Sequence, residues 1–103
     1  MKKQPRNPDY EEGGLVKISG KFLLDHEEDI LNLVKKEGKL AEERNNNSHI
    51  SDIQKNGQGI LLRASDHNLA IRIGKAVHKA YKGELDLKFR EGEKFAEVIW
   101  KRD

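Results

Sequence analysis

A row of cationic side chains is the pattern in this 103-residue sequence best suited to chemistry. The row consists of Arg72, Lys75, Lys79 and Lys82, with His78 beside it. Steps of three and four residues place side chains on one face of an α-helix. No acidic residue falls between His67 and Lys82, so this face is unbroken. It could bind phosphates or an acidic protein, or it could be a solvated surface that pairs with acids on a neighbouring helix.

The side chains that commonly catalyse reactions or bind metals are not spaced as a catalytic or metal site would require. The histidines are His26, His49, His67 and His78. No two of them stand one helical turn apart, as two ligands of one ion on a helix would. A run of carboxylates comprises Asp25, Glu27, Glu28 and Asp29. Nearly consecutive residues spread around a helix, so these carboxylates do not converge on one ion. The sequence also has no phosphate-binding loop and no turn of the kind that presents a nucleophilic serine. We therefore expect that the protein is not an enzyme and binds neither a metal nor a cofactor.

The composition excludes several classes of protein. The sequence has no cysteine, which excludes disulfides, thiol catalysis and cysteine-based zinc sites. With 35% hydrophobic and 37% charged residues, it predicts one small domain with a modest core. A net charge of +2 is too small to indicate nucleic-acid binding by itself. No apolar run approaches the ~20 residues that span a bilayer, so we expect a cytoplasmic protein without membrane contact.

The cationic row must be positioned by a helix over residues 65–83. Ser65 or Asp66 can cap its first turn, and Gly83 suits the left-handed position that closes many helices. The apolar face of this helix comprises Leu69, Ala70, Ile73, Ala76, Val77, Ala80 and Tyr81. The residues on the border between the two faces are Ile71, Gly74 and His78. This amphipathic pattern predicts that the helix packs one face on a core and leaves the cations outside.

The first part of the chain predicts an arm followed by a strand. Residues 1–13 hold both prolines and several charges, which is typical of a flexible arm. Residues 14–103 then form a single domain. In the strand Leu15–Ile18, alternation predicts that Val16 and Ile18 face the core.

The sequence predicts another helix after this strand, and it begins between Ser19 and Asp25. Asp25 and Glu28 have the spacing of a capping box. The predicted apolar stripe of this helix consists of Leu23, Leu24, Ile30, Leu31 and Val34. Gly38 interrupts the helical pattern, and the polar run 45–48 predicts a loop.

A first hairpin joins strands 50–55 and 58–64. The Asn56-Gly57 pair favours a two-residue turn, because both residues tolerate a positive φ. Such a turn places Ile53 opposite Ile60, with the inward side chains of the second strand on the same face.

A second hairpin ends the chain, and charge selects its register. A Gly92-Glu93 turn pairs unlike charges, such as Lys88 with Glu97, whereas a turn one residue earlier pairs like charges. We predict the first register. It leaves Phe95 and Ile99 on the sheet face away from the core.

These elements follow one another in the order β-α-β-β-α-β-β. An amphipathic sheet with two amphipathic helices predicts an α+β fold, a two-layer sandwich with both helices on one face. The natural candidate is a ferredoxin-like split β-α-β arrangement with an extra C-terminal strand, which we expect at an edge of the sheet.

Two parts of the chain carry a family resemblance. The first comprises residues 14–26 together with 30–34, and the second comprises residues 65–67, 69–70, 72–74, 76–78, 80–81 and 83. In these residues the chain resembles small bacterial proteins related to the family of nonsense-mediated-decay and ribosome-export adaptors. Those proteins carry a cysteine-rich, zinc-ribbon-like segment ahead of this region, and the present chain lacks it. The resemblance implies a bacterial protein tied to RNA or to ribosomes, and it assigns no functional residue.

The sequence therefore predicts a non-enzymatic binding domain for RNA or a ribonucleoprotein. The residues expected to contact phosphates are Arg72, Lys75, His78, Lys79 and Lys82. The alternative is a module for protein interaction or homodimer formation through the outer sheet face or an edge strand, with Phe95 and Ile99 as anchors. Phosphate binding should weaken steeply with salt, whereas apolar association should not.

Overall fold

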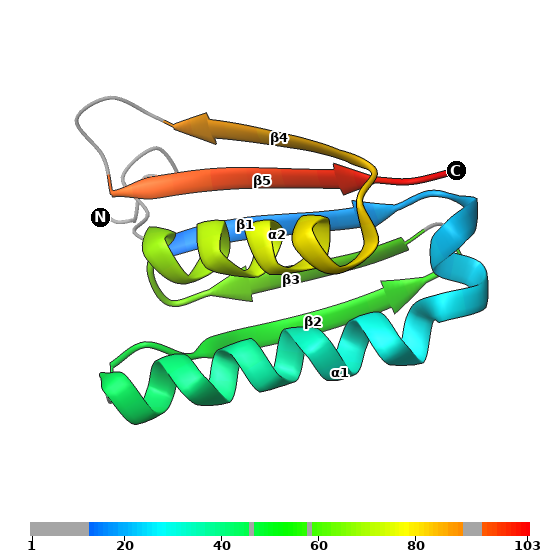
Figure 1. The fold of residues 1–103 in the computed structure, drawn as a ribbon. Helices are drawn as coiled ribbons and strands as arrows, with labels where there is room; N and C mark the ends of the chain where they lie inside the picture. Colours follow the sequence, from blue (N-terminus) through cyan, green and yellow to red (C-terminus); the bar gives the residue numbers. More distant parts are fainter. Residues whose placement is uncertain (1–12, 46, 58, 90–93) are drawn as a thin grey trace.

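The computed structural model describes residues 13–45, 47–57, 59–89 and 94–103, and within them seven elements follow the predicted order (Figure 1). The elements are β1 (Gly13–Ser19), α1 (Lys21–Arg44), β2 (Ile50–Asn56), β3 (Gly59–Ala64), α2 (His67–Tyr81), β4 (Glu84–Phe89) and β5 (Phe95–Lys101). The predicted arm lies outside the described residues except for Gly13, which begins β1. Neither described helix is long and apolar enough to cross a membrane.

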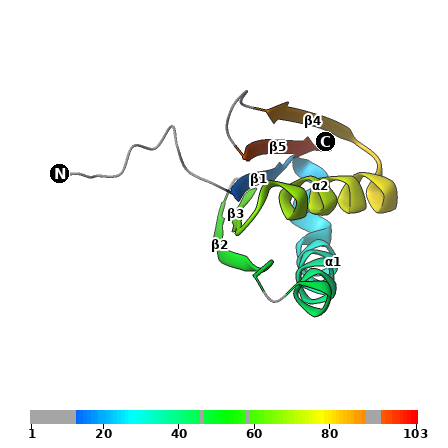
Figure 2. The same ribbon diagram turned by 90° about the vertical axis from the view of Figure 1, so that its left-hand side faces the viewer.

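Both helices lie on one face of a single mixed sheet, so the predicted two-layer α+β sandwich is confirmed (Figure 1, Figure 2). The strand order is β2-β3-β1-β5-β4, with β1 parallel to β5 and antiparallel to β3. The prediction that the last strand lies at an edge is wrong, because β5 is inserted between β1 and β4. β5 is the more apolar strand of its hairpin, whereas every second residue of β4 is charged, which suits an edge. Since β1 has a parallel neighbour, the ferredoxin-like split is not confirmed.

The core lies between the sheet and the two helices. Its largest fully buried side chains are Trp100, Ile18, Leu23, Ile30, Leu62, Leu69, Ile73, Val16, Val34, Val77 and Val98. The inward orientation predicted for Val16 and Ile18 is confirmed. Trp100 has no exposed surface, and its indole N–H donates to the carbonyl of Lys82 at the end of α2. The last core strand is thereby tied to the helix that carries the cationic row.

α2 approaches the sheet closely through small residues. A Cβ on Gly74 would lie 2.3 Å from Val98 Cγ1, and a Cβ on Gly14 would lie 2.3 Å from Ala70 Cβ. Gly74, which the pattern placed on a border, is therefore in the centre of the contact. Ala80, which the pattern placed on the apolar face, is exposed because the buried arc is centred on Ile73, Gly74 and Val77.

α1 begins four residues before the predicted capping box. Gly20 precedes it with a φ of 110°, and His26 departs from helical geometry with a φ of −131°. The His26 ring stacks on Phe22, with 3.9 Å between ring centroids. This break changes the phase of the apolar stripe, so Leu23 is buried whereas Leu24 is 67% exposed. The prediction that Leu24 belongs to the core is therefore wrong.

Gly38 does not interrupt α1. It is a buried helix residue, and a Cβ at this position would lie 2.7 Å from Ile50 Cδ1 of β2. The missing side chain lets α1 approach the strand here. The loop predicted for residues 45–48 is confirmed to the extent that α1 ends at Arg44 and β2 begins at Ile50.

The predicted register is wrong for the first hairpin and correct for the second. In the first, Asn56 is a strand residue opposite Gly59, and Ile53 lies opposite Leu62 instead of Ile60. The Asn56 side chain accepts a hydrogen bond from the Gly59 amide at 3.0 Å, which favours the later turn. A shift of two residues keeps the same side chains on the same face.

The predicted register of the second hairpin is confirmed. Lys88 lies opposite Glu97, and Glu84 lies opposite Lys101. The predicted Gly92-Glu93 turn itself lies outside the described residues.

Candidate nucleic-acid interface

A partly buried hydrogen-bond network fixes the first turn of α2. Asp66 caps the helix, and its Oδ1 accepts from the Leu69 amide at 2.8 Å. Its Oδ2 accepts from the hydroxyl of Ser48 at 2.7 Å, which joins the start of α2 to the loop after α1. Burial raises the pKa of Asp66, but hydrogen bonds from Ser48, Leu69 and Ser65 outweigh burial and hold this pKa below its ordinary value of 3.8. The cap therefore stays ionised, and it holds the helix that presents the cations.

Three cations of the predicted row lie together on α2. Arg72, Lys75 and Lys79 are exposed and line a cavity of about 440 Å³ against α1. The wall that faces them includes a single acidic residue among the described ones, Glu37. The predicted row is therefore brought together over two helical turns, beside a hollow that a ligand could enter.

These cations are not neutralised within the described part of the chain. None of them forms an ion pair there with a carboxylate. Glu27 of α1 instead pairs with Lys55 of β2 at 3.4 Å. The alternative that the row pairs with acids of the other helix is thus not what the described residues show.

A second cavity of about 590 Å³ continues this surface at the start of α2. Arg72 lines both cavities, and here it is joined by Arg44 at the end of α1 and by Lys94 just before β5. Ser65, Asp66, Asn68 and other polar residues complete the lining. We call Arg44, Arg72, Lys75, Lys79 and Lys94 the basic surface.

Sequence reasoning missed Arg44 and Lys94. Both are single cations at the ends of elements, 28 residues before and 22 residues after Arg72, and no local spacing links them. Tertiary packing brings them together. β5 lies beside β1 with its first residue in register with Gly13, which places Lys94, and the Ser48–Asp66 hydrogen bond joins the segment after α1 to the start of α2, which places Arg44. A prediction of both strand order and helix packing would have been needed to find them.

Lys82 of the predicted row and His78 beside the row lie outside the basic surface. Lys82 follows the last turn of α2 with a φ of 63°, and its carbonyl is occupied by Trp100. His78 is half-buried. Neither residue lines either of the two cavities, so the structure does not bring them together with Arg72.

The outer face of the sheet differs from the basic surface in charge. Unlike charges face one another across its strands, as in Lys88 and Glu97, and Lys17 forms an ion pair with Glu97 at 2.8 Å. Phe95 is only 7% exposed, and Ile99 is half-buried. The two anchors proposed for this face therefore offer little free apolar surface in the described structure.

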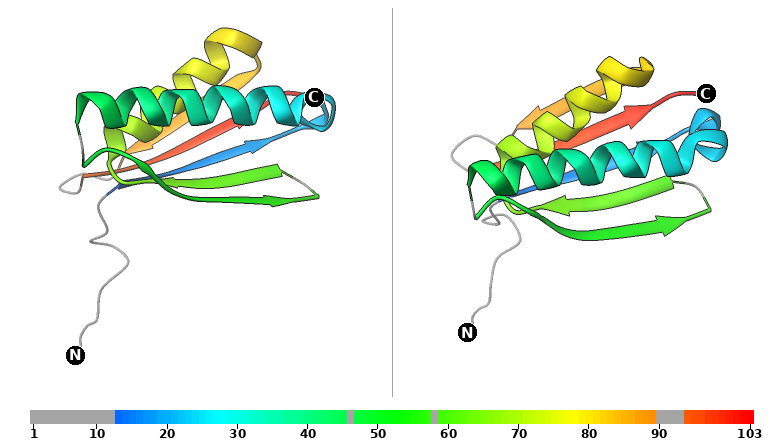
Figure 3. Two further views of the ribbon diagram at one scale, coloured as in Figure 1. Left: turned by 90° about the horizontal axis from the view of Figure 1, so that it is seen from below. Right: turned by 60° about the horizontal axis from the view of Figure 1, so that its bottom comes forward.

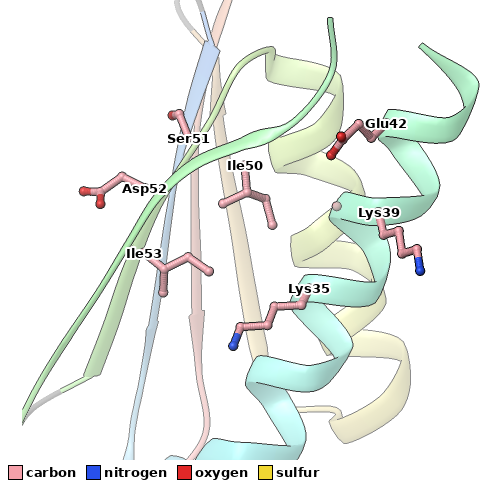
Figure 4. A pocket seen from close by; sticks show the side chains of 8 residues that line it. Lys35, Lys39, Glu42, Ile50, Ser51, Asp52 and Ile53 are labelled. Atoms are coloured by element: carbon pink, nitrogen blue, oxygen red, sulfur yellow. The ribbon is translucent and has the colours of Figure 1, made fainter. Parts of the chain in front are cut away.

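A third hollow, of about 470 Å³, separates α1 from β2 (Figure 4). Ile50 and Ile53 point from the strand toward the helix. Its charged lining residues are Lys35, Lys39, Glu42 and Asp52. Since cations and carboxylates balance here, this hollow is less suited to phosphate than the basic surface.

No other protein supplies an assignment. Comparisons with protein-family models, with curated proteins and with solved structures find no match. Within the described residues, no three His, Asp or Glu side chains gather as a metal site would require. The resemblance to nonsense-mediated-decay and ribosome-export adaptors stays a prediction.

Proposed function

We propose that this protein is a non-enzymatic domain that binds the phosphate backbone of RNA, free or within a ribonucleoprotein such as the ribosome, through its basic surface. The observation that carries the proposal is the convergence of five cations from three parts of the chain around two cavities that share Arg72. None of the five is neutralised by an ion pair within the described residues.

The chemistry of this surface suits phosphodiesters. Guanidinium groups bind phosphate oxygens through two parallel hydrogen bonds, and lysine ammonium groups add positive charge along a flexible stem. Arg44 and Arg72 supply the first kind of group, and Lys75, Lys79 and Lys94 supply the second. Because these side chains are exposed, they bind at little cost in desolvation.

The same surface offers little aromatic area for reading bases by stacking, since His67 is the one aromatic ring among the described residues that line the two cavities. Among the described residues that line the two cavities, none is Phe, Tyr or Trp. Sequence-specific recognition of single-stranded RNA commonly stacks bases on aromatic rings. We therefore expect binding that depends strongly on salt and weakly on sequence.

A titration of labelled single-stranded RNA at several salt concentrations tests the proposal. If each of the five cations neutralises one phosphate, the logarithm of the association constant falls against the logarithm of salt with a slope of about −3.5. The double variant Arg72→Ala/Lys79→Ala keeps three of these cations, so its slope should be about −2. Circular dichroism checks that the variant is folded.

A matched control separates this surface from net charge. Lys17→Ala/Lys101→Ala removes the same charge from the outer sheet face, where Lys17 forms an ion pair with Glu97 and Lys101 lies opposite Glu84. This control should bind RNA as tightly as the wild type. Equal losses in both variants, no binding at low salt, or tighter binding to polyglutamate than to RNA would each contradict the proposal.

A further inference from the structure

The two edges of the sheet are protected to different degrees. β2 carries a bulge between Ile50 and Asp52, and Glu27 of α1 reaches across to Lys55 of this strand. Bulges and covering helices are devices that prevent further strands from adding to an edge. β4 has neither device, since it pairs with β5 in continuous register from Glu84 to Phe89. In Figure 1 and Figure 2, no described element lies beyond β4.

β4 also carries an uncovered aromatic side chain. Phe89 is on the helix face of the sheet, in line with Leu85 and Leu87, yet it is 62% exposed. Figure 3 shows that α2 crosses the strands obliquely. Its middle turn, at Gly74, reaches Leu85, so the helix covers the beginning of β4 and leaves its end open.

The sequence of β4 is complementary to itself. We infer that two copies of this chain associate through antiparallel pairing of their β4 edges about a two-fold axis at Leu87. This pairing places Asp86 of each copy opposite Lys88 of the other, on the outer face of the joined sheet. On the helix face, it places Phe89 opposite Leu85 of the second copy, so the exposed ring gains an apolar neighbour.

Charge selects this register among its neighbours. Shifting the axis to Asp86 keeps two Glu84–Lys88 pairs but places two aspartates opposite one another at the centre, and shifting it to Lys88 places two lysines opposite one another there. Like charges directly opposite each other destabilise a strand pair. Those two alternatives change the pairing register by two residues. A change of the register by one residue instead brings the apolar side chains of one copy opposite the charged side chains of the other. The pairing at Leu87 is thus the one in which charge and apolar contact agree.

The paired edges give a continuous sheet of ten described strands, with the helices of both copies on the same side. A two-fold axis perpendicular to the sheet keeps the helix faces together, because it exchanges the copies without turning the sheet over. The inference is independent of the proposed function, since neither β4 nor Phe89 belongs to the basic surface.

Charge-swapped variants test this pairing by sedimentation of the full chain, without RNA. The wild type should form a dimer with twice the chain mass. Asp86→Lys and Lys88→Asp each place like charges opposite one another twice, so each should weaken the dimer at least about tenfold. An equimolar mixture of the two variants restores both unlike pairs and should recover a dimer that contains one copy of each.

The control variant Asp52→Lys changes the other edge by the same charge and should leave the dimer intact. Phe89→Ser should weaken the dimer while leaving the circular dichroism spectrum unchanged, because the ring is exposed in the single copy. A wild type that is monomeric at all concentrations, a dimer that responds only to Asp52→Lys, or failure of the mixture to associate would overturn the inference.

Discussion

Where α2 crosses the sheet, its backbone lies close to β1 and β5, whereas α1 meets β2 through Ile50 at Gly38 and leaves a hollow beside Ile53. Gly14 and Gly74 remove the side chains that would separate α2 from the strands. On the other side of the molecule, a hollow of about 470 Å³ remains between α1 and Ile53 (Figure 4). One side of the helix layer is therefore closely packed and the other is open.

This difference determines on which side of the molecule the backbone beneath a ligand-binding surface is held in a fixed position. Close packing holds a helix in one position, because shifting it would break many small contacts together. Arg72, Lys75 and Lys79 lie on the closely packed helix, so the fold fixes the backbone positions from which these side chains extend. The open side between α1 and β2 can accommodate changes of side-chain volume at lower cost.

The largest expected effect on stability comes from replacing one isoleucine by alanine on the closely packed side and one on the open side. Ile73→Ala on α2 removes a side chain with no exposed surface and should lower the free energy of unfolding by about 3–4 kcal/mol. Ile53→Ala on β2 removes a half-buried side chain beside the open hollow, where the cost should be about 1 kcal/mol. Urea denaturation followed by circular dichroism measures both. Equal losses would show that the two sides are packed alike.

Glycine substitutions give a smaller effect and should differ in sign. Gly74→Ala directs a methyl group at the fully buried Val98, and the strain of about 1–3 kcal/mol should exceed the helix propensity gained. Gly38→Ala directs a methyl group at the Ile50 side chain, 2.7 Å from Cδ1 and 3.0 Å from Cγ1, and this half-buried side chain can turn into the hollow that it lines. It should therefore leave stability unchanged or raise it by up to about 1 kcal/mol. Thermal unfolding of both variants decides, and destabilisation of both to the same extent would contradict the contrast.

Local patterns were sufficient where the physical cause was local. The period of the apolar residues predicted both helices, and the opposed charges of Lys88 and Glu97 predicted the register of the second hairpin. At Asn56-Gly57 the pattern failed, since the predicted and observed registers put the same side chains on the core face. The alternation could not distinguish them, and the side chain of Asn56 decided the outcome.

Long-range order was beyond the sequence pattern. Nothing near β5 indicates that it lies between β1 and β4, because strand order depends on which pairings bury the most apolar surface across the whole sheet. The same order brings Lys94 to Arg72, and the packing of the end of α1 against the start of α2 brings Arg44, so the candidate site was predicted only along α2. Likewise, Leu24 is exposed beside the break at His26, whose φ of −131° departs from helical geometry, and the apolar period does not predict such a break.

The smallest expected effect lies at Asp66, where the two sides of the helix layer meet. Its carboxylate caps α2 and accepts a hydrogen bond from Ser48 in the segment that follows α1. At neutral pH, Asp66→Ala should lower the free energy of unfolding by about 1 kcal/mol, as the loss of a helix cap usually does. Asp66→Asn keeps an oxygen for the cap and should cost less.

The pH dependence of stability gives this prediction its sign. Because the pKa of Asp66 is below 3.8 in the folded protein, ionisation of this group stabilises the fold above pH 3.8, and the contribution is lost as the pH falls through the folded pKa. Between neutral pH and strong acid, the wild type should therefore lose more stability than Asp66→Asn, which has no proton to bind. Urea denaturation from pH 6 down to about 2.5 measures the difference between the two curves. Parallel curves would mean that the Ser48 and Leu69 hydrogen bonds do not favour the charged carboxylate, and that the joint between the two sides is held by packing alone.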